Sequence, residues 1–113
     1  MSGLVPRAFN KDRILVTGFA PFLGQKTNPS AELAKALAST YGVSSLILPV
    51  TLGQSWEILS SQLGSVNYEA VILLGQASRR QKVSLERIAV NWWESQDADE
   101  NGENPSPGPI VDG

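Results

Sequence analysis

The sequence predicts an α/β fold in which strands alternate with helices around a mainly parallel sheet. Three short runs rich in β-branched and aliphatic residues occupy residues 13–17, 46–50 and 70–74, and such runs are typical of buried strands. Between them, apolar residues recur at helical spacing over residues 29–41 and 55–63. This order of strand, helix, strand, helix and strand favours parallel strands joined by right-handed crossovers.

The first predicted strand leads through a loop into the first predicted helix. This loop holds Phe19 and Phe22 on either side of a proline and ends at Asn28 and Pro29. Asparagine can cap a free backbone N–H, and proline fits the first helical position, so the pair marks a helix start. Loops at the carboxyl ends of strands form ligand sites in open α/β sheets. We interpret the two phenylalanines as an apolar slot for a small, flat, uncharged group, or alternatively as side chains that plug the loop onto the core.

A phosphate-binding loop is the main alternative for this segment. Gly18, Gly24 and Lys26 come near that motif, which needs four residues between its glycines and a lysine directly after the second. Here five residues separate the glycines, and Gln25 precedes the lysine. Pro21 also removes a backbone N–H that phosphate would need. The spacing therefore disfavours phosphate binding.

Leucine and aromatic residues mark the expected buried faces of the two helices. Leu33, Leu37 and Tyr41 recur every four residues, which places them on one face of the first helix. Trp56 shares an apolar face of the second helix with two leucines. We expect this tryptophan in the core rather than in a platform for a ligand.

The later strands differ in clarity. Residues 70–74, AVILL, are apolar at every position, which is typical of a strand covered on both faces. Pro49 indicates that the preceding strand ends there or lies at a sheet edge. Residues 83–93 show an alternation that favours a strand, although Leu85 and Ile88 also fit a helical turn.

The composition restricts the chemistry. The chain has 113 residues, 42% hydrophobic and 18% charged, with a net charge of −2 and neither cysteine nor histidine. These values are ordinary for one soluble globular domain. The absent residue types exclude thiolate metal sites, the commonest nucleophile and the commonest general base, and we expect no metal and no cofactor. No apolar run approaches the roughly 20 residues of a membrane span, so we expect a cytoplasmic protein without a membrane partner.

Two segments carry other signals. Residues 1–10 lack periodicity, and Leu4–Arg7 resembles a protease-cleavable linker, so we expect a disordered or vector-derived leader before a domain at residues 11–113. A small basic cluster is weak as a nucleic-acid site because the chain is net acidic, and we expect no nucleic-acid partner. A solvated or substrate-facing loop is the simpler interpretation of this basic cluster, which consists of Arg79, Arg80, Lys82 and Arg87.

Two motifs resemble the type I pyroglutamyl peptidases, also called pyrrolidone-carboxylate peptidases. Residues 17–24, TGFAPFLG, followed by NPS at residues 28–30, resemble the family pattern T-G-F-x-P-F-G-G and N-P-S/T, with Leu23 replacing a glycine. GQASRR at residues 75–80, followed by ERIAVN, resembles G-Q-A-x-G-R and E-R-x-A-x-N. Residues 95–102 lack the Arg-Ile-Pro core of the family's A-R-I-P-D-N-E-G loop.

The resemblance implies a three-layer α/β/α sandwich around a mixed, mainly parallel sheet that is incomplete in this chain. It implies a cysteine peptidase that removes N-terminal pyroglutamate from peptides through a Cys-His-Glu triad. Glu86 corresponds to the triad carboxylate; taken alone, it would instead be a surface carboxylate paired with Arg87 or Lys82. The substrate-binding positions that the resemblance implies are Phe19, Phe22, Gln76, Asn28 and Arg80.

The resemblance covers residues 13–113, about the first half of a family member, and the family's cysteine and histidine belong to the other half. We therefore expect this chain to be inactive alone. The alternative is a non-catalytic half-domain that binds a partner or pyroglutamyl peptide ends. An incomplete sheet exposes apolar edges, so we also expect self-association into a homo-oligomer or loose packing, with residues 94–113 the most mobile.

Overall fold

A computed structural model describes residues 10–112. The alternation of strands and helices that the sequence predicts is confirmed. The leader expected at residues 1–10, with its linker-like Leu4–Arg7, lies outside the described residues except for Asn10. The elements in chain order are η1 (Lys11–Arg13), β1 (Ile14–Phe19), α1 (Pro29–Tyr41), β2 (Ser44–Leu48), α2 (Leu52–Ser65) and β3 (Ala70–Leu73).

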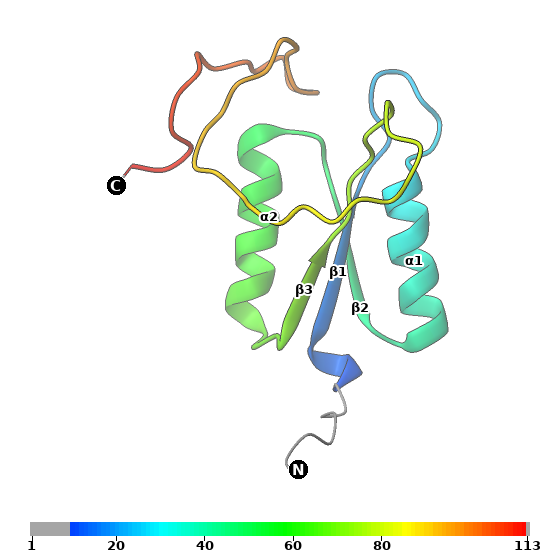
Figure 1. Ribbon diagram of the computed structural model, residues 1–113. Helices are drawn as coiled ribbons and strands as arrows, with labels where there is room; N and C mark the ends of the chain where they lie inside the picture. Colours follow the sequence, from blue (N-terminus) through cyan, green and yellow to red (C-terminus); the bar gives the residue numbers. More distant parts are fainter. Residues whose placement is uncertain (1–9, 113) are drawn as a thin grey trace.

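The three strands form a parallel sheet in the order β2-β1-β3. In the centre, Val16 of β1 is aligned with Ser45 of β2 and with Ile72 of β3. Parallel neighbours need a crossover connection, and the two helices provide these crossovers on opposite faces of the sheet (Figure 1). The helix–sheet–helix layering is therefore present, with three strands. Pro49 directly follows β2, which is an edge strand.

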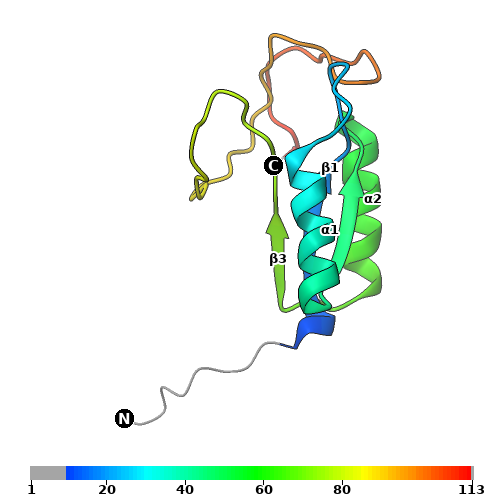
Figure 2. The ribbon, with the colours of Figure 1, turned by 90° about the vertical axis from the view of Figure 1, so that its right-hand side faces the viewer.

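All three strands run in the same direction, so the loops that follow them gather at one end of the sheet. Both ribbon views show these loops at the end opposite η1 (Figures 1 and 2). This carboxyl end is where α/β sheets bind ligands. Neither helix within residues 10–112 is long and apolar enough to cross a bilayer.

The core is small and is built around β1. Its most buried hydrophobic residues are Leu15 and Val16 of β1 and Ala34 of α1. The prediction that a leucine and tyrosine stripe buries α1 is wrong at two of its positions, because Leu33 is 48% exposed and Tyr41 is 64% exposed. Helix α1 instead turns small residues toward the sheet, which lets it lie close to β1.

Gly18 shows how close this approach is. A Cβ atom at this position would overlap the backbone carbonyl of Ser30 in the first turn of α1. Because backbone atoms cannot move aside as a side chain can, only glycine fits this point of contact. The position of α1 against β1 therefore depends on Gly18.

Two predictions about apolar residues are corrected. The expectation that both faces of β3 are covered is wrong for this chain, since Leu73 is 64% exposed and its neighbours Val71 and Ile72 are also exposed. Trp56 is 60% exposed and is not a core residue. Only two helices cover the described sheet, and α2 lies near β2 rather than over all three strands.

The strand predicted at residues 83–93 is also wrong. In the described chain this segment is irregular, and its one pairing is an isolated antiparallel bridge between Trp93 and Gly108. Alternation alone cannot form a strand, because every strand needs a neighbour to accept and donate its backbone hydrogen bonds. Within residues 10–112, no strand lies beside residues 83–92 to do so.

We predict that Gly18→Ala lowers the free energy of unfolding by about 1–3 kcal/mol, the usual penalty for overpacking. The added methyl group must displace the start of α1. Gly53→Ala in α2 is the control for an added methyl group: outside its own helix backbone a Cβ there meets no atom within 4 Å, so this variant should keep or raise stability. Denaturant unfolding followed by circular dichroism measures both variants. Equal stability of Gly18→Ala and the unsubstituted chain would contradict the close contact.

Candidate functional site

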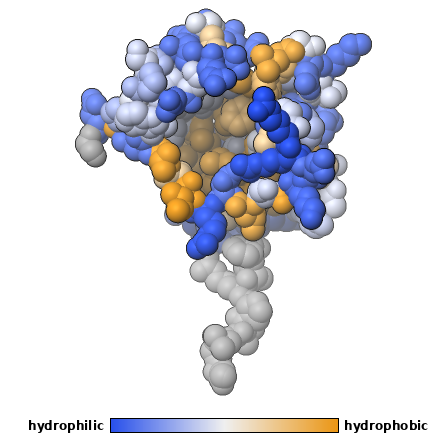
Figure 3. All heavy atoms as spheres, turned by 45° about the horizontal axis from the view of Figure 1, so that its top comes forward, coloured by the Kyte–Doolittle hydropathy of each residue, from blue (hydrophilic) through white to orange (hydrophobic). Residues whose placement is uncertain are grey.

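The candidate site lies at the carboxyl end of the sheet. Residues 20–28 follow β1 and residues 74–86 follow β3 at this end, and residues 95–104 lie against the first of these segments, where Glu100 bonds to Leu23. In the space-filling view, this end shows a hollow with hydrophobic residues inside and hydrophilic residues around it (Figure 3). The segments come from distant parts of the sequence, so only the fold brings them together.

Asn28 and Ser30 fasten the first loop to α1. The side chain of Asn28 accepts hydrogen bonds from the Ser30 N–H at 3.0 Å and from the Ser30 hydroxyl at 2.7 Å. Its amide group donates to the Ala20 carbonyl at 3.2 Å. The Ser30 hydroxyl in turn accepts from the Phe19 N–H at 2.9 Å. Asn28 is buried, so its side chain holds both ends of the loop, and the predicted helix start is confirmed.

Phe22 lines a cavity of about 250 Å³. Val50, Trp93, Ser95 and residues 97–100 form other parts of its wall. Ligand pockets for drug-sized molecules measure about 300–1,000 Å³, so this cavity suits a smaller group. Phe19 is half-buried at the end of β1 and does not line this cavity. The structure therefore does not bring both phenylalanines into one slot.

The turn after Phe22 has an unusual backbone. Leu23 and Gly24 both have positive φ, at 55° and 73°. A left-handed conformation is unfavourable by roughly 1–2 kcal/mol for a residue with a side chain. This strain gives a physical reason why a glycine suits the position that Leu23 occupies.

Gln76, Arg80 and Glu86 belong to the segment after β3. Gln76 is half-buried. Arg80 lines a second cavity, of about 390 Å³, between this segment and the first turn of α1. Its guanidinium lies 2.6 Å from the Glu86 carboxylate, and the Glu86 side chain is 72% exposed. An exposed ion pair contributes only about 0–1 kcal/mol, so it does not anchor the segment.

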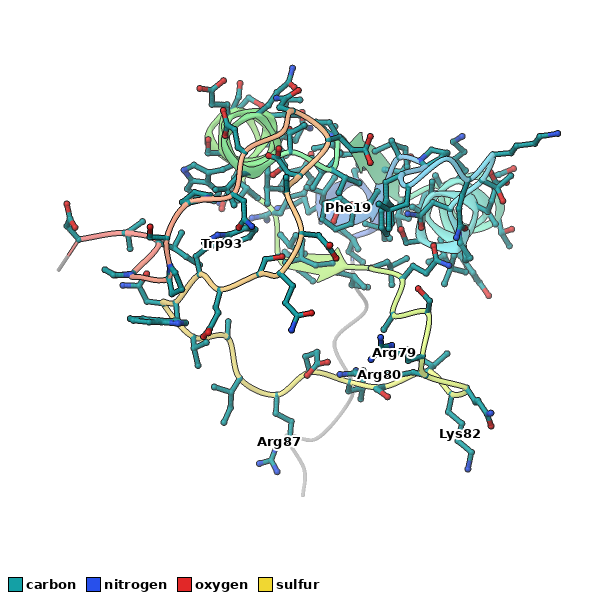
Figure 4. The ribbon with its side chains drawn as sticks, turned by 90° about the horizontal axis from the view of Figure 1, so that it is seen from above. Phe19, Arg79, Arg80, Lys82, Arg87 and Trp93 are labelled. Carbon is teal, nitrogen blue, oxygen red and sulfur yellow. The ribbon has the colours of Figure 1, made fainter. Side chains whose placement is uncertain are left out.

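Glu86 is thus a surface carboxylate in this chain, and its partner is neither Arg87 nor Lys82. Both of those side chains point away from the rest of the molecule (Figure 4). The predicted site residues also divide between cavities, since Phe22 lines one and Arg80 lines another. No group of three or more metal-ligating side chains occurs within residues 10–112.

Asp99 is a residue that the sequence analysis did not single out. Its Oδ2 accepts a hydrogen bond from the Leu52 N–H at 2.7 Å, and its Oδ1 accepts from the Asn101 and Glu103 N–H groups at 2.9 and 2.8 Å. The bond from Leu52 is the main reason that the pKa of Asp99 lies below its ordinary value; partial burial opposes this effect, and the other two bonds support it. The sequence signal was a turn that starts at Asp99 and ends near Gly102, which has a φ of 78°.

The parallel sheet with motif-bearing loops at its carboxyl end is the arrangement by which α/β proteins hold small ligands. Residues 12–113 match the family model described as pyroglutamyl peptidase. The chain therefore belongs to the pyroglutamyl peptidase family.

Relatives and solved structures agree with this assignment. The pyrrolidone-carboxylate peptidase of Thermococcus kodakarensis is 38% identical over 104 residues, which cover 89% of this chain and 50% of the relative. The structure of pyrrolidone carboxyl peptidase from Fervidobacterium islandicum AW-1 is similar with a TM-score of 0.82 at 34% identity, covering 87% of this chain and 49% of that one. The structure of pyroglutamyl peptidase I from Bacillus amyloliquefaciens is similar with a TM-score of 0.82 at 31% identity. The match covers 88% of this chain and 50% of that one. This chain spans about half the length of these relatives.

Proposed function

We propose that this chain supplies the ring-binding and carboxylate-bearing part of a cysteine-type peptidase that removes N-terminal pyroglutamate from peptides. The observation that carries the proposal is the family match over residues 12–113, which includes both motifs. The carboxyl end of the parallel sheet supports it further, because both motif-bearing loops follow strands that end there.

The proposed ligand is a five-membered lactam, which is flat, apolar on its faces, and polar at one N–H and one carbonyl. Apolar side chains, among them Phe22 and Trp93, line part of this cavity and suit the faces of such a ring. The amide side chain of Gln76 can both donate and accept hydrogen bonds, so we assign it to the polar edge. The family resemblance assigns Phe19 to the same ring, although in this chain Phe19 is half-buried at the end of β1 and does not line the cavity.

The proposed reaction is acyl transfer to a thiolate. The thiolate attacks the pyroglutamyl carbonyl, an imidazole moves the proton to the leaving amine, and water releases the acid. Glu86 is the carboxylate that orients the imidazole and stabilises its charged form. The chain contains neither cysteine nor histidine, so this mechanism needs another polypeptide segment to supply both groups.

Glu86 would need a different environment for this role. Triad carboxylates are buried beside their imidazole, whereas this side chain is largely exposed and paired with Arg80. We assign the covering of residues 80–90 to the segment that carries the cysteine and histidine. Arg80 would exchange its weak surface pairing with Glu86 for that environment, and it remains near the substrate in this proposal.

A second candidate is a non-catalytic domain that binds pyroglutamyl ends or a partner. The complete absence of cysteine and histidine favours it. The exposed apolar side chains of β3 also favour a partner, which could be another copy of this chain.

Alone, the 113-residue chain should hydrolyse no pyroglutamyl substrate, because it lacks a nucleophilic thiol and an imidazole base. Joined to the second half of the Thermococcus kodakarensis relative, it should release a fluorogenic amine from a pyroglutamyl substrate. The control is the same fusion treated with a thiol-blocking reagent. Hydrolysis by the purified chain would overturn the mechanism, and an inactive but well-folded fusion would favour the binding role.

In that fusion, Glu86→Gln should lower kcat by about 10²–10⁴ and leave the fold intact, by analogy with the loss of a triad carboxylate. Lys82→Gln is the control, since it also removes a charge from the same exposed segment. Circular dichroism and steady-state kinetics test both variants. Unchanged turnover in Glu86→Gln would remove Glu86 from the mechanism.

Phe19→Ala and Phe22→Ala in the fusion should raise KM for the pyroglutamyl substrate more than they lower stability. The reason is that ring faces would lose their apolar contacts. If both variants instead lose the roughly 3–5 kcal/mol expected of a buried phenylalanine with KM unchanged, the two side chains are plugs of the core. Thermal unfolding alongside kinetics separates these outcomes.

A further inference from the structure

We propose that Asp99 and Glu100 are positioning residues that clasp residues 95–104 against Phe22 and so set the width of the small cavity. The role concerns the proposed ring-binding function and rests on it. We call these two residues the acidic clasp.

The first half of the clasp is the attachment of Asp99 to α2. The residue that precedes this helix, Thr51, makes no side-chain capping bond. The Asp99 carboxylate replaces that bond by accepting from Leu52 N–H at 2.7 Å, across 47 residues of sequence. An anion at this end of a helix is also favoured by the helix dipole. The loop is thereby fixed to a rigid element rather than only to itself.

The second half of the clasp is the attachment of Glu100. Its N–H donates to the Val50 carbonyl at 3.0 Å. Its Oε1 accepts from the Leu23 N–H at 3.1 Å, directly beside Phe22. Two adjacent acidic residues therefore join three segments: the loop after β1, the connection from β2 to α2, and residues 95–104.

The same three segments, together with Trp93, form the cavity wall. Phe22 and Leu23 contribute one part, Val50 another, and Ser95 with residues 97–100 a third. No described helix or strand contributes residues 95–104, so their place depends on local bonds. Within the loop, Asp99 also accepts from the Asn101 and Glu103 N–H groups, which shapes the loop before any ligand arrives. Such preorganisation improves affinity by lowering the entropy lost on binding.

The three residues before the clasp form no hydrogen bond to the loop after β1 or to the connection from β2 to α2 within residues 10–112. This chain lacks the Arg-Ile-Pro core at residues 96–98 and has Gln96, Asp97 and Ala98 there. These side chains are exposed, so they do not hold the loop by burial. The two residues that follow them make the connections instead.

The test uses the whole 113-residue chain labelled with ¹⁵N. Asparagine has one acceptor oxygen and cannot replace both carboxylate oxygens of Asp99. In Asp99→Asn, the Leu52, Asn101 and Glu103 amides should therefore exchange with solvent at least about tenfold faster, as expected for loss of hydrogen bonds to a charged group. The amide resonances of Phe22 and Leu23 should also shift, although that variant leaves their own bonds intact.

Three further variants distinguish a positioning role from a general loss of structure. Glu100→Ala should shift the Phe22 and Leu23 resonances, whereas Glu100→Gln keeps an acceptor oxygen and should restore them. Asp112→Asn is the matched charge control, because within residues 10–112 that carboxylate accepts no hydrogen bond and it does not line the cavity. Unchanged exchange in β1 confirms that each variant is folded.

Titration with L-pyroglutamamide connects the clasp to the ligand. Asp99→Asn should weaken binding at least about tenfold relative to the unsubstituted chain and to Asp112→Asn. Unchanged Phe22 and Leu23 resonances in Asp99→Asn, or unchanged affinity, would overturn the positioning role. If the unsubstituted chain binds no L-pyroglutamamide but the ligand-free shifts occur as expected, the clasp holds the cavity and the proposed substrate is wrong for this chain.

Discussion

The contact between β1 and the first turn of α1 is the constraint on which the rest of the structure depends. Gly18 lets the backbone of Ser30 lie against the strand, and the Ser30 hydroxyl receives the N–H of Phe19. Asn28 then closes the loop by bonding to both Ser30 and Ala20. A glycine in the strand and an Asn-Pro-Ser helix start thus act as one unit, because each would lose its role without the other.

This junction also determines where the candidate site forms. It fixes the two ends of the loop that carries Phe22, while Leu23 and Gly24 make the turn in left-handed conformations. The rest of the cavity wall comes from Val50 after β2, from Trp93, and from Ser95 with residues 97–100. Because the walls of this cavity come from separate segments, their relative positions depend on the hydrogen bonds that join those segments. Asp99 and Glu100 are therefore as relevant to this site as the aromatic side chain inside it.

The segment after β3, in contrast, is largely exposed to solvent. Its residues from Arg80 to Val90 are exposed, and the apolar members of β3 are only partly covered. A carboxylate such as Glu86 keeps its solvation there and pairs with Arg80 across the surface. The chain spans about half the length of the relatives it matches, and the proposed chemistry needs two residue types that it lacks. The exposure of residues 80–90, the match to only half of each relative, and the lack of cysteine and histidine therefore all favour a partner segment.

The sequence by itself determined the alternation of strands and helices, the start of α1 at Pro29 and the family. These depend on local properties: β-branched runs, an asparagine cap and motif spacing act over a few residues. The tertiary structure decided what local patterns cannot: that residues 83–93 form no strand without a neighbour, that Trp56 and Leu33 remain exposed, and that Phe19 and Phe22 do not share one cavity. It also decided the role of Asp99, because a carboxylate caps a helix 47 residues away only when the fold brings the two together.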